Sequence, residues 1–124
     1  MKSPLSRGTE PAYALFRIAV GLLFAFHGAQ KLFGLFGGSA QPLMTRLGAA
    51  GIIEFSCGLL VALGLLTWLA AFIASGEMVA AYYLAHMPRA LLPIQNGGEL
   101  ALLYCVAFLF IAMRGPGIFS VEKH

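Results

Sequence analysis

The stretch IAVGLLFAFHGAQKLFGLFGG, residues 18–38, decides how this chain folds. Residues 18–26 carry no charged or polar side chain, and with the residues around them they are long enough for a helix that crosses a bilayer. His27, Gln30 and Lys31 follow within the same segment, before Gly37 and Gly38 end it. Because polar and charged side chains inside a membrane are costly and usually functional, the stretch predicts a membrane helix that carries a polar site.

The composition of the whole chain also indicates a membrane protein. Of the 124 residues, 60% are hydrophobic and only 10% are charged, whereas a soluble domain carries roughly a quarter charged residues. The mean hydropathy is +0.85. The eight Lys and Arg residues are scattered, which argues against a nucleic-acid-binding patch. The lipid bilayer is therefore the expected partner, and the polar residues 1–13 are expected to be a short tail rather than a signal peptide.

Four apolar segments are separated by residues that favour turns. We expect transmembrane helices at about residues 12–36, 47–65, 68–87 and 99–114. Pro42, Pro88 and the pair Gly97–Gly98 mark boundaries, since proline cannot continue a helix and glycine favours turns. The turn near residues 64–68 has no such mark apart from Gly64. The prediction is an all-α integral membrane four-helix bundle, with residues 1–124 forming a single domain.

Four spans would place both termini on one side of the membrane. The positive-inside rule then compares basic residues on the two sides, and it favours cytoplasmic termini by a small margin. The residues on the side of the termini are Lys2, Arg7, Arg114 and Lys123, and those on the opposite side are Lys31, Arg46 and Arg89.

The charged residues within the spans sort into two layers when position is converted to depth at about 1.5 Å per residue. Lys31, Glu54 and Glu99 fall in the outer layer, and Arg17 and Glu77 fall in the inner layer. Each layer contains both signs, and an unpaired buried charge is costly. We therefore predict that Lys31 contacts Glu54, Glu99 or both. We also predict a structural ion pair between Arg17 and Glu77.

The outer layer is also rich in uncharged polar side chains. His27, His86 and Asn96 are expected at the same depth as its charges, which favours a polar pocket over a purely structural salt bridge. A divalent metal is a chemical alternative for the histidines and acids, but the neighbouring Lys31 opposes a cation, so no metal is predicted. Small residues accompany the charges along the helix faces, which predicts close helix packing. These include Gly21, Gly28, Gly51 and Gly58.

The two cysteines, Cys57 and Cys105, are far apart in the sequence and form no CxxC motif. Both are expected near the middle of the membrane, where a thiol behaves as a small apolar group. We predict that they are unpaired packing residues.

Four stretches in order resemble the DoxX family of small bacterial four-helix membrane proteins. They are FHGAQKLFGLFGG (26–38), EFSCGLLVALGLLT (54–67), NGGELALLY (96–104) and GPGIFSVE (115–122). The resemblance extends from about residue 16 to 122 and implies a multi-pass protein of the bacterial inner membrane. The tail departs slightly, with Ser120-Val121-Glu122 where members often have Ser-Leu-Asp. The residues that match the family's polar pattern are Arg17, His27, Gly28, Lys31, Glu54, Gly58, Glu77, Asn96, Gly97, Gly98 and Glu99.

The resemblance also implies a range of functions, since the family is linked with quinol-dependent sulfur oxidation and with assemblies that handle thiols and oxidative stress. The sequence shows no flavin motif, so the cofactor that its polar pocket would suit is a quinone. We expect a quinone-linked redox subunit or accessory protein that exchanges electrons with a partner protein; whether the chain is itself an enzyme stays open. Catalytic roles are assigned to Lys31, Glu54 and Glu99, and cofactor binding to His27, His86 and Asn96.

Two alternatives are carried beside this expectation. The first is a non-catalytic membrane adaptor that recruits partners through its tails and loops. The second is a small transporter or proton pathway, which four helices would support more readily in a homo-oligomer.

Overall fold

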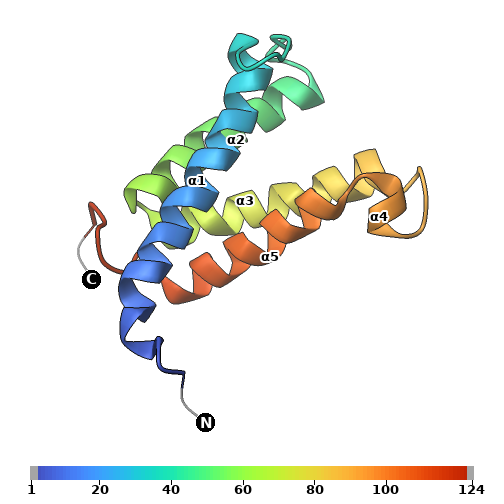
Figure 1. The fold of residues 1–124 in the computed structure, drawn as a ribbon. Helices are drawn as coiled ribbons and strands as arrows, with labels where there is room; N and C mark the ends of the chain where they lie inside the picture. The colour runs from blue at the N-terminus through green and yellow to red at the C-terminus, as the bar shows by residue number, and fades with distance from the viewer. Residues whose placement is uncertain (1–2, 123–124) are drawn as a thin grey trace.

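The computed structural model describes residues 3–122. All regular secondary structure in this part of the chain is helical (Figure 1). The all-α prediction is confirmed. A short 3₁₀ turn, Ser6–Gly8, leads into the first helix, and a π-helical segment, Tyr82–His86, extends the third. The helices are α1 (Thr9–Phe33), α2 (Arg46–Leu63), α3 (Thr67–Ala81), α4 (Pro93–Asn96) and α5 (Glu99–Arg114).

The helix ends follow from local sequence. Both α1 and α2 end at a glycine in the left-handed conformation, Gly34 at φ 68° and Gly64 at φ 72°, which glycine adopts without strain. The first helix therefore begins and ends three residues earlier than predicted, with the same length. Thr45 caps α2, because its hydroxyl accepts a hydrogen bond from the Gly48 N–H at 3.1 Å. The predicted turn near residues 64–68 is confirmed between α2 and α3.

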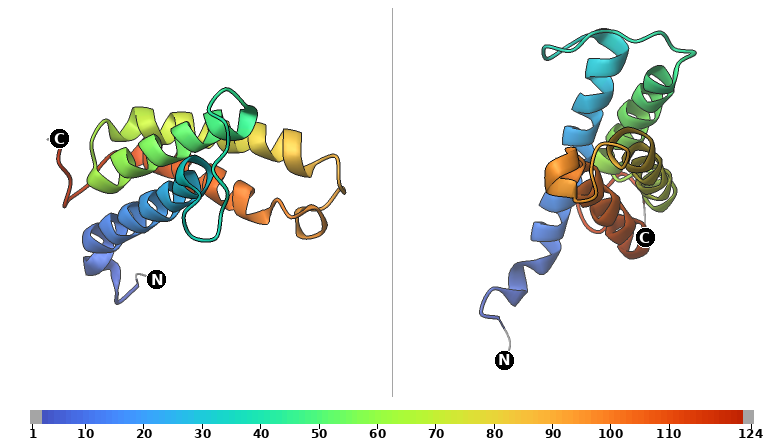
Figure 2. Two further views of the ribbon diagram at one scale, coloured as in Figure 1. Left: turned by 90° about the horizontal axis from the view of Figure 1, so that it is seen from above. Right: turned by 90° about the vertical axis from the view of Figure 1, so that its right-hand side faces the viewer.

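The long helices form two arms. Helix α1 packs along α2, and α3 packs along α5 (Figures 1 and 2). The arms meet near the α2–α3 turn and diverge toward the opposite end, so that the ribbon has the outline of a V in Figure 1. The predicted four-helix bundle assumes that all helices run along one axis. The two arms do not, because they diverge (Figure 1).

Glycines bring the backbones of α1 and α2 into contact, as their spacing predicts. A Cβ atom added to Gly58 would lie 2.6 Å from both the Ala25 nitrogen and the Gly21 oxygen. A Cβ atom on Gly28 would likewise collide with the backbone of Phe55. Small residues allow membrane helices to approach this closely, and the gain in van der Waals contact stabilises the pair.

Three helical segments of the described chain are long and apolar enough to cross a membrane: Ser6–Phe33, Arg46–Leu63 and Thr67–His86. Helix α5 has 16 residues and a length of about 24 Å, which is less than the roughly 30 Å of the hydrocarbon core. Its apolar side chains Leu103 and Val106 are each 65% exposed, as they would be against lipid. A fourth span over α5 stays a prediction.

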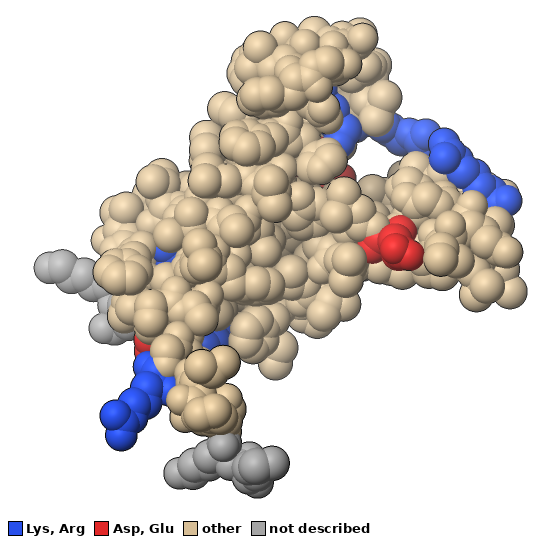
Figure 3. All heavy atoms as spheres, viewed as in Figure 1, with Lys and Arg blue, Asp and Glu red and all other residues tan. Residues whose placement is uncertain are grey.

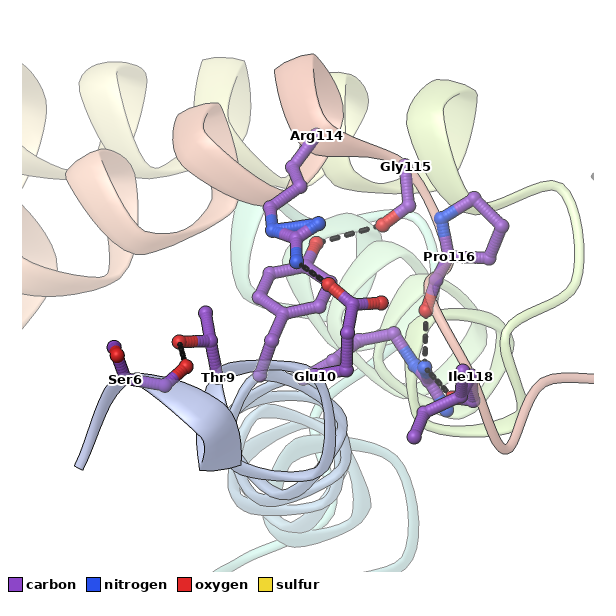
Figure 4. Close-up of polar contacts among 9 residues, drawn as sticks. Ser6, Thr9, Glu10, Arg114, Gly115, Pro116 and Ile118 are labelled. Atoms are coloured by element: carbon purple, nitrogen blue, oxygen red, sulfur yellow. Dashed lines mark hydrogen bonds and ion pairs between the residues drawn. The ribbon is translucent and has the colours of Figure 1, made fainter. Parts of the chain in front are cut away.

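The predicted ion pair between Arg17 and Glu77 is wrong: the structure shows no contact between them. Arg17 is fully buried (0% exposed), and its guanidinium donates hydrogen bonds to backbone carbonyls instead. The last carbonyls of α2 have no partner within the helix, and the C-terminal segment passes close to them, so acceptors are available to Arg17 there. Glu77 lines the cleft instead. The acceptors are Val61 (3.0 Å), Ala62 (3.4 Å), Ile118 (3.0 Å), Phe119 (2.6 Å) and Pro116; Figure 4 includes Pro116 and Ile118.

Further contacts hold the C-terminal segment against the rest of the protein. The Tyr13 hydroxyl donates to the Gly115 carbonyl at 2.6 Å, and Arg114 pairs with Glu10 and lies over the Tyr13 ring (Figure 4). Farther along, the Glu122 carboxylate accepts a hydrogen bond from the Thr67 N–H at 2.9 Å, at the start of α3. The segment after α5 thus joins the two arms where they meet.

Candidate functional site

The cleft between the two arms is the candidate site. Its volume is 610 Å³, and all four long helices and the π-helical segment contribute to its walls. Figure 3 shows the hollow between the arms, with basic side chains above it. The walls are mainly apolar, with side chains such as Phe24, Ile53, Met78 and Leu84. The polar residues that line the cleft are His27, Lys31, Arg46, Glu54, Glu77, His86 and Tyr104.

Lys31 and Glu54 form the ion pair that the sequence predicts. The Lys31 ammonium lies 2.5 Å from Glu54 Oε1, and the side chain of Glu54 is only 3% exposed. Lys31 is in the last turn of α1, where a positive charge interacts favourably with the helix dipole. Glycine packing of α1 on α2 brings the two side chains together. The pair therefore lies within the arm formed by α1 and α2.

Glu99 does not join this pair. It is exposed at the first residue of α5 and is absent from the cleft lining. Its position on the helix explains this, since the buried residues Ala101, Tyr104 and Phe108 lie about 140–200° around the helix from it. The prediction that Glu99 begins the last helix is confirmed. Depth along a helix does not give the direction of the side chain, so the predicted contact with Lys31 was not found.

The two histidines line the cleft, whereas Asn96 does not. The His27 ring meets the Tyr104 ring edge-on, with 5.9 Å between ring centroids. His86 Nδ1 lies 3.2 Å from the Asn96 carbonyl oxygen. Asn96 is 1% exposed and holds the loop, since its amide nitrogen donates to the Tyr82 hydroxyl and its side-chain oxygen accepts from the Gly98 N–H. Its hydrogen-bonding groups are thus used within the loop.

Glu77 is a cleft residue that sequence reasoning placed elsewhere, in the inner layer with Arg17. Its Oε1 atom is buried and has no hydrogen-bond partner among residues 3–122. It lines the same cleft as Lys31 and Glu54. The small-residue face that Glu77 shares with Ala74 was the available signal, because Glu54 lies on a similar face of α2.

The remaining candidate ligands form no further site in the described chain. No group of three His, Cys, Asp or Glu side chains between residues 3 and 122 is arranged to hold a metal ion. Cys57 and Cys105 are both free, which confirms that they are unpaired. Cys105 Sγ lies 3.4 Å from the Ser75 hydroxyl.

Comparison with known proteins identifies the family. A model of the DoxX family matches residues 12–87, which is more than half of the chain. The protein belongs to the DoxX family. The DoxX match extends from α1 through the π-helical segment, and so it contains Lys31, Glu54 and Glu77 but not α5.

Two relatives support the assignment to DoxX. An uncharacterized protein of Haemophilus influenzae is 39% identical, over 89% of this chain and 87% of its own length. A protein of Mycobacterium tuberculosis that is named as an uncharacterized membrane protein is 30% identical, over 91% of this chain and 80% of its own length. No solved structure matches. Family, relatives and apolar helices together indicate a membrane protein.

Proposed function

We propose that this DoxX-family protein binds the head group of a quinone or quinol in the cleft, as a redox subunit or accessory protein of a quinone-linked oxidoreductase. The observation that carries the proposal is the corner formed by Lys31, Glu54 and Glu77 within an otherwise apolar cleft. The cleft's volume of 610 Å³ lies within the range of about 300–1,000 Å³ that is usual for small-molecule sites.

The side chains fit such a ligand. An ammonium group has three N–H donors, and the Glu54 contact of Lys31 uses one, so others are available for a quinone oxygen. His27 supplies a ring nitrogen in the same cleft. The carboxyl groups of Glu54 and Glu77 are suited to accept a proton when a quinol is oxidised. In this proposal the two electrons pass to a partner redox protein, and the apolar walls hold the isoprenoid tail.

The proposal predicts that the cleft is labelled by a photoreactive quinone analogue. Lys31→Met removes a charged donor but keeps the length of the side chain, and a hydrogen bond to a charged group contributes about 1.5–3 kcal/mol. At subsaturating analogue, labelling of the purified protein is therefore expected to fall about tenfold or more. Glu99→Gln is the matched control, because Glu99 is exposed and outside the cleft. Labelling of this variant should equal that of the wild type.

Equal labelling of Lys31→Met and the wild type would contradict quinone binding at this site. If Lys31→Met also unfolded at a lower temperature, the ion pair would have a structural role only. The adaptor hypothesis would then lead. One observation favours it: the connections at the open ends of the arms, including α4, expose Met44 (98%), Leu91 (88%) and Ile94 (78%), which suits contact with another protein.

The orientation that we propose is that of an inner-membrane protein with both termini in the cytoplasm, supported by the balance of basic residues. An impermeant thiol reagent added outside the cell should then label a cysteine introduced at Ser39 or Gln95. A cysteine introduced at Ser3 should be protected until the membrane is opened. The reverse pattern would show that the orientation is wrong.

A further inference from the structure

The mouth of the cleft carries two arginines, one at the open end of each arm. Arg46 lines the cleft at the first residue of α2. Arg89 follows the π-helical segment, and a Cβ atom added to the cleft residue Gly97 would lie 3.9 Å from its Nη1 atom. Both side chains are exposed, and between residues 3 and 122 neither guanidinium forms an ion pair. Glu99, the nearest acid in sequence to Gly97, is itself exposed and does not line the cleft.

Both arginines lie at the level of the chain where a membrane boundary is expected. The α2–α3 turn is at one end of the two apolar spans, Arg46–Leu63 and Thr67–His86. At 1.5 Å per residue the spans are about 27 and 30 Å long, close to the roughly 30 Å of the hydrocarbon core. Arg46 and His86 are therefore at the opposite boundary, and Arg89 is three residues beyond it. This is the level of the lipid phosphate groups.

The wall of the cleft just inside the mouth is apolar and half uncovered. Leu47 and Leu100 both line the cleft, and they are 51% and 50% exposed. Cations at the headgroup level attract anionic lipids, and a guanidinium can bind a phosphate through two parallel hydrogen bonds. From the mouth inward the cleft thus presents cations and then an apolar wall. A phospholipid has its phosphate and its acyl chain in the same order.

We propose that the mouth of the cleft binds an anionic phospholipid, with its phosphate between Arg46 and Arg89 and an acyl chain along Leu47 and Leu100. A free phosphate ion would contact the arginines but leave the apolar wall uncovered. The site goes beyond the proposed function and does not depend on it, because Glu54 lies eight residues, or about 12 Å, farther along α2 than Arg46.

Photoreactive phospholipids test this site. The full-length protein is reconstituted in phosphatidylcholine bilayers that contain a trace of phosphatidylglycerol or phosphatidylcholine with a photoreactive group in its acyl chain. If each arginine contributes roughly fivefold, phosphatidylglycerol should label Leu47 and Leu100 about 25-fold more strongly than phosphatidylcholine does. Leu15 is exposed on α1 and does not line the cleft, so both lipids should label it equally.

Substitution of the arginines tests their part in binding. Arg46→Gln and Arg89→Gln should each lower the labelling of the mouth by phosphatidylglycerol about fivefold, and the double variant about 25-fold. Arg7→Gln is the matched control, because Arg7 is exposed in the 3₁₀ turn before α1, and it should label as the wild type does. Since all three arginines are exposed, thermal unfolding in pure phosphatidylcholine should be unchanged in every variant.

Several results would overturn the phospholipid site. These are equal labelling of the mouth by the two lipids, unchanged labelling in the double variant, full competition by an excess of inorganic phosphate, and cross-links to a second copy of the chain in place of lipid. Quinone labelling is measured separately, in bilayers of phosphatidylcholine alone. If the lipid labels the mouth while the quinone does not label the cleft, the proposed function fails and the phospholipid site stands. The reverse result overturns only the phospholipid site.

Discussion

Replacing Gly58 with alanine is expected to lower the free energy of unfolding by about 2–3 kcal/mol, the usual effect of overpacking a close interface. The added Cβ would lie 2.6 Å from backbone atoms of α1, the Ala25 nitrogen and the Gly21 oxygen. Backbone atoms cannot rotate away as a flexible side chain can, so α1 and α2 must separate. Separation would also move Lys31 relative to Glu54 and weaken quinone labelling.

Gly76→Ala is the control for this change. Gly76 is also within a membrane helix, but it is exposed and a Cβ there meets no atom within 4 Å. Its substitution should be neutral, or stabilising by up to about 1 kcal/mol, because alanine is the better helix former. Reversible unfolding in mixed detergent micelles measures both variants. Equal stability of the two would show that α1 and α2 are not held in backbone contact.

Arg17→Met is expected to destabilise the protein by about 3 kcal/mol or more, since hydrogen bonds to a charged group contribute about 1.5–3 kcal/mol each. The guanidinium is fully buried and bonds to five backbone carbonyls. Methionine fills similar space but donates none of these bonds. The segment from Pro116 to Phe119 should therefore detach, and protease cleavage in it should become faster.

Arg7→Met provides the comparison, because Arg7 is exposed in the 3₁₀ turn near the same end of the protein. It should leave both unfolding and proteolysis unchanged. If Arg17→Met behaved in the same way, the carbonyl cluster would not hold the C-terminal segment. Arg17→Lys should be intermediate, since lysine keeps the charge but lacks the planar set of five donors.

Helix type and local contacts were predictable because they follow from short-range rules. The turn at Gly64 follows from the local sequence at the end of α2. The glycine contact of α1 with α2 and the pair of Lys31 with Glu54 arise within one helical hairpin. Neighbouring helices of a hairpin run nearly antiparallel, so position along the chain gives depth directly. The conversion of sequence to depth therefore succeeded there.

The arrangement of the second arm was not predictable in this way. The depth argument assumes that all helices cross the membrane at one angle, but the arms diverge (Figure 1). Glu77 therefore lines the cleft that also contains Glu54, and it does not pair with Arg17. The partners of Arg17 are backbone carbonyls, which every residue carries, so no side-chain pattern indicates them. Asn96 likewise bonds within its own loop, a use that its polarity alone does not reveal.

The site at which the photoreactive quinone attaches to the wild-type protein tests the central claim most directly. The analogue is activated in detergent-free membranes, and the labelled peptides are identified by mass spectrometry. Binding in the cleft predicts attachment near Ile53, Met78 and Leu84, with loss of this labelling in Lys31→Met. Attachment to exposed residues outside the cleft, such as Leu15 and Phe72, with no change in Lys31→Met, would contradict the account.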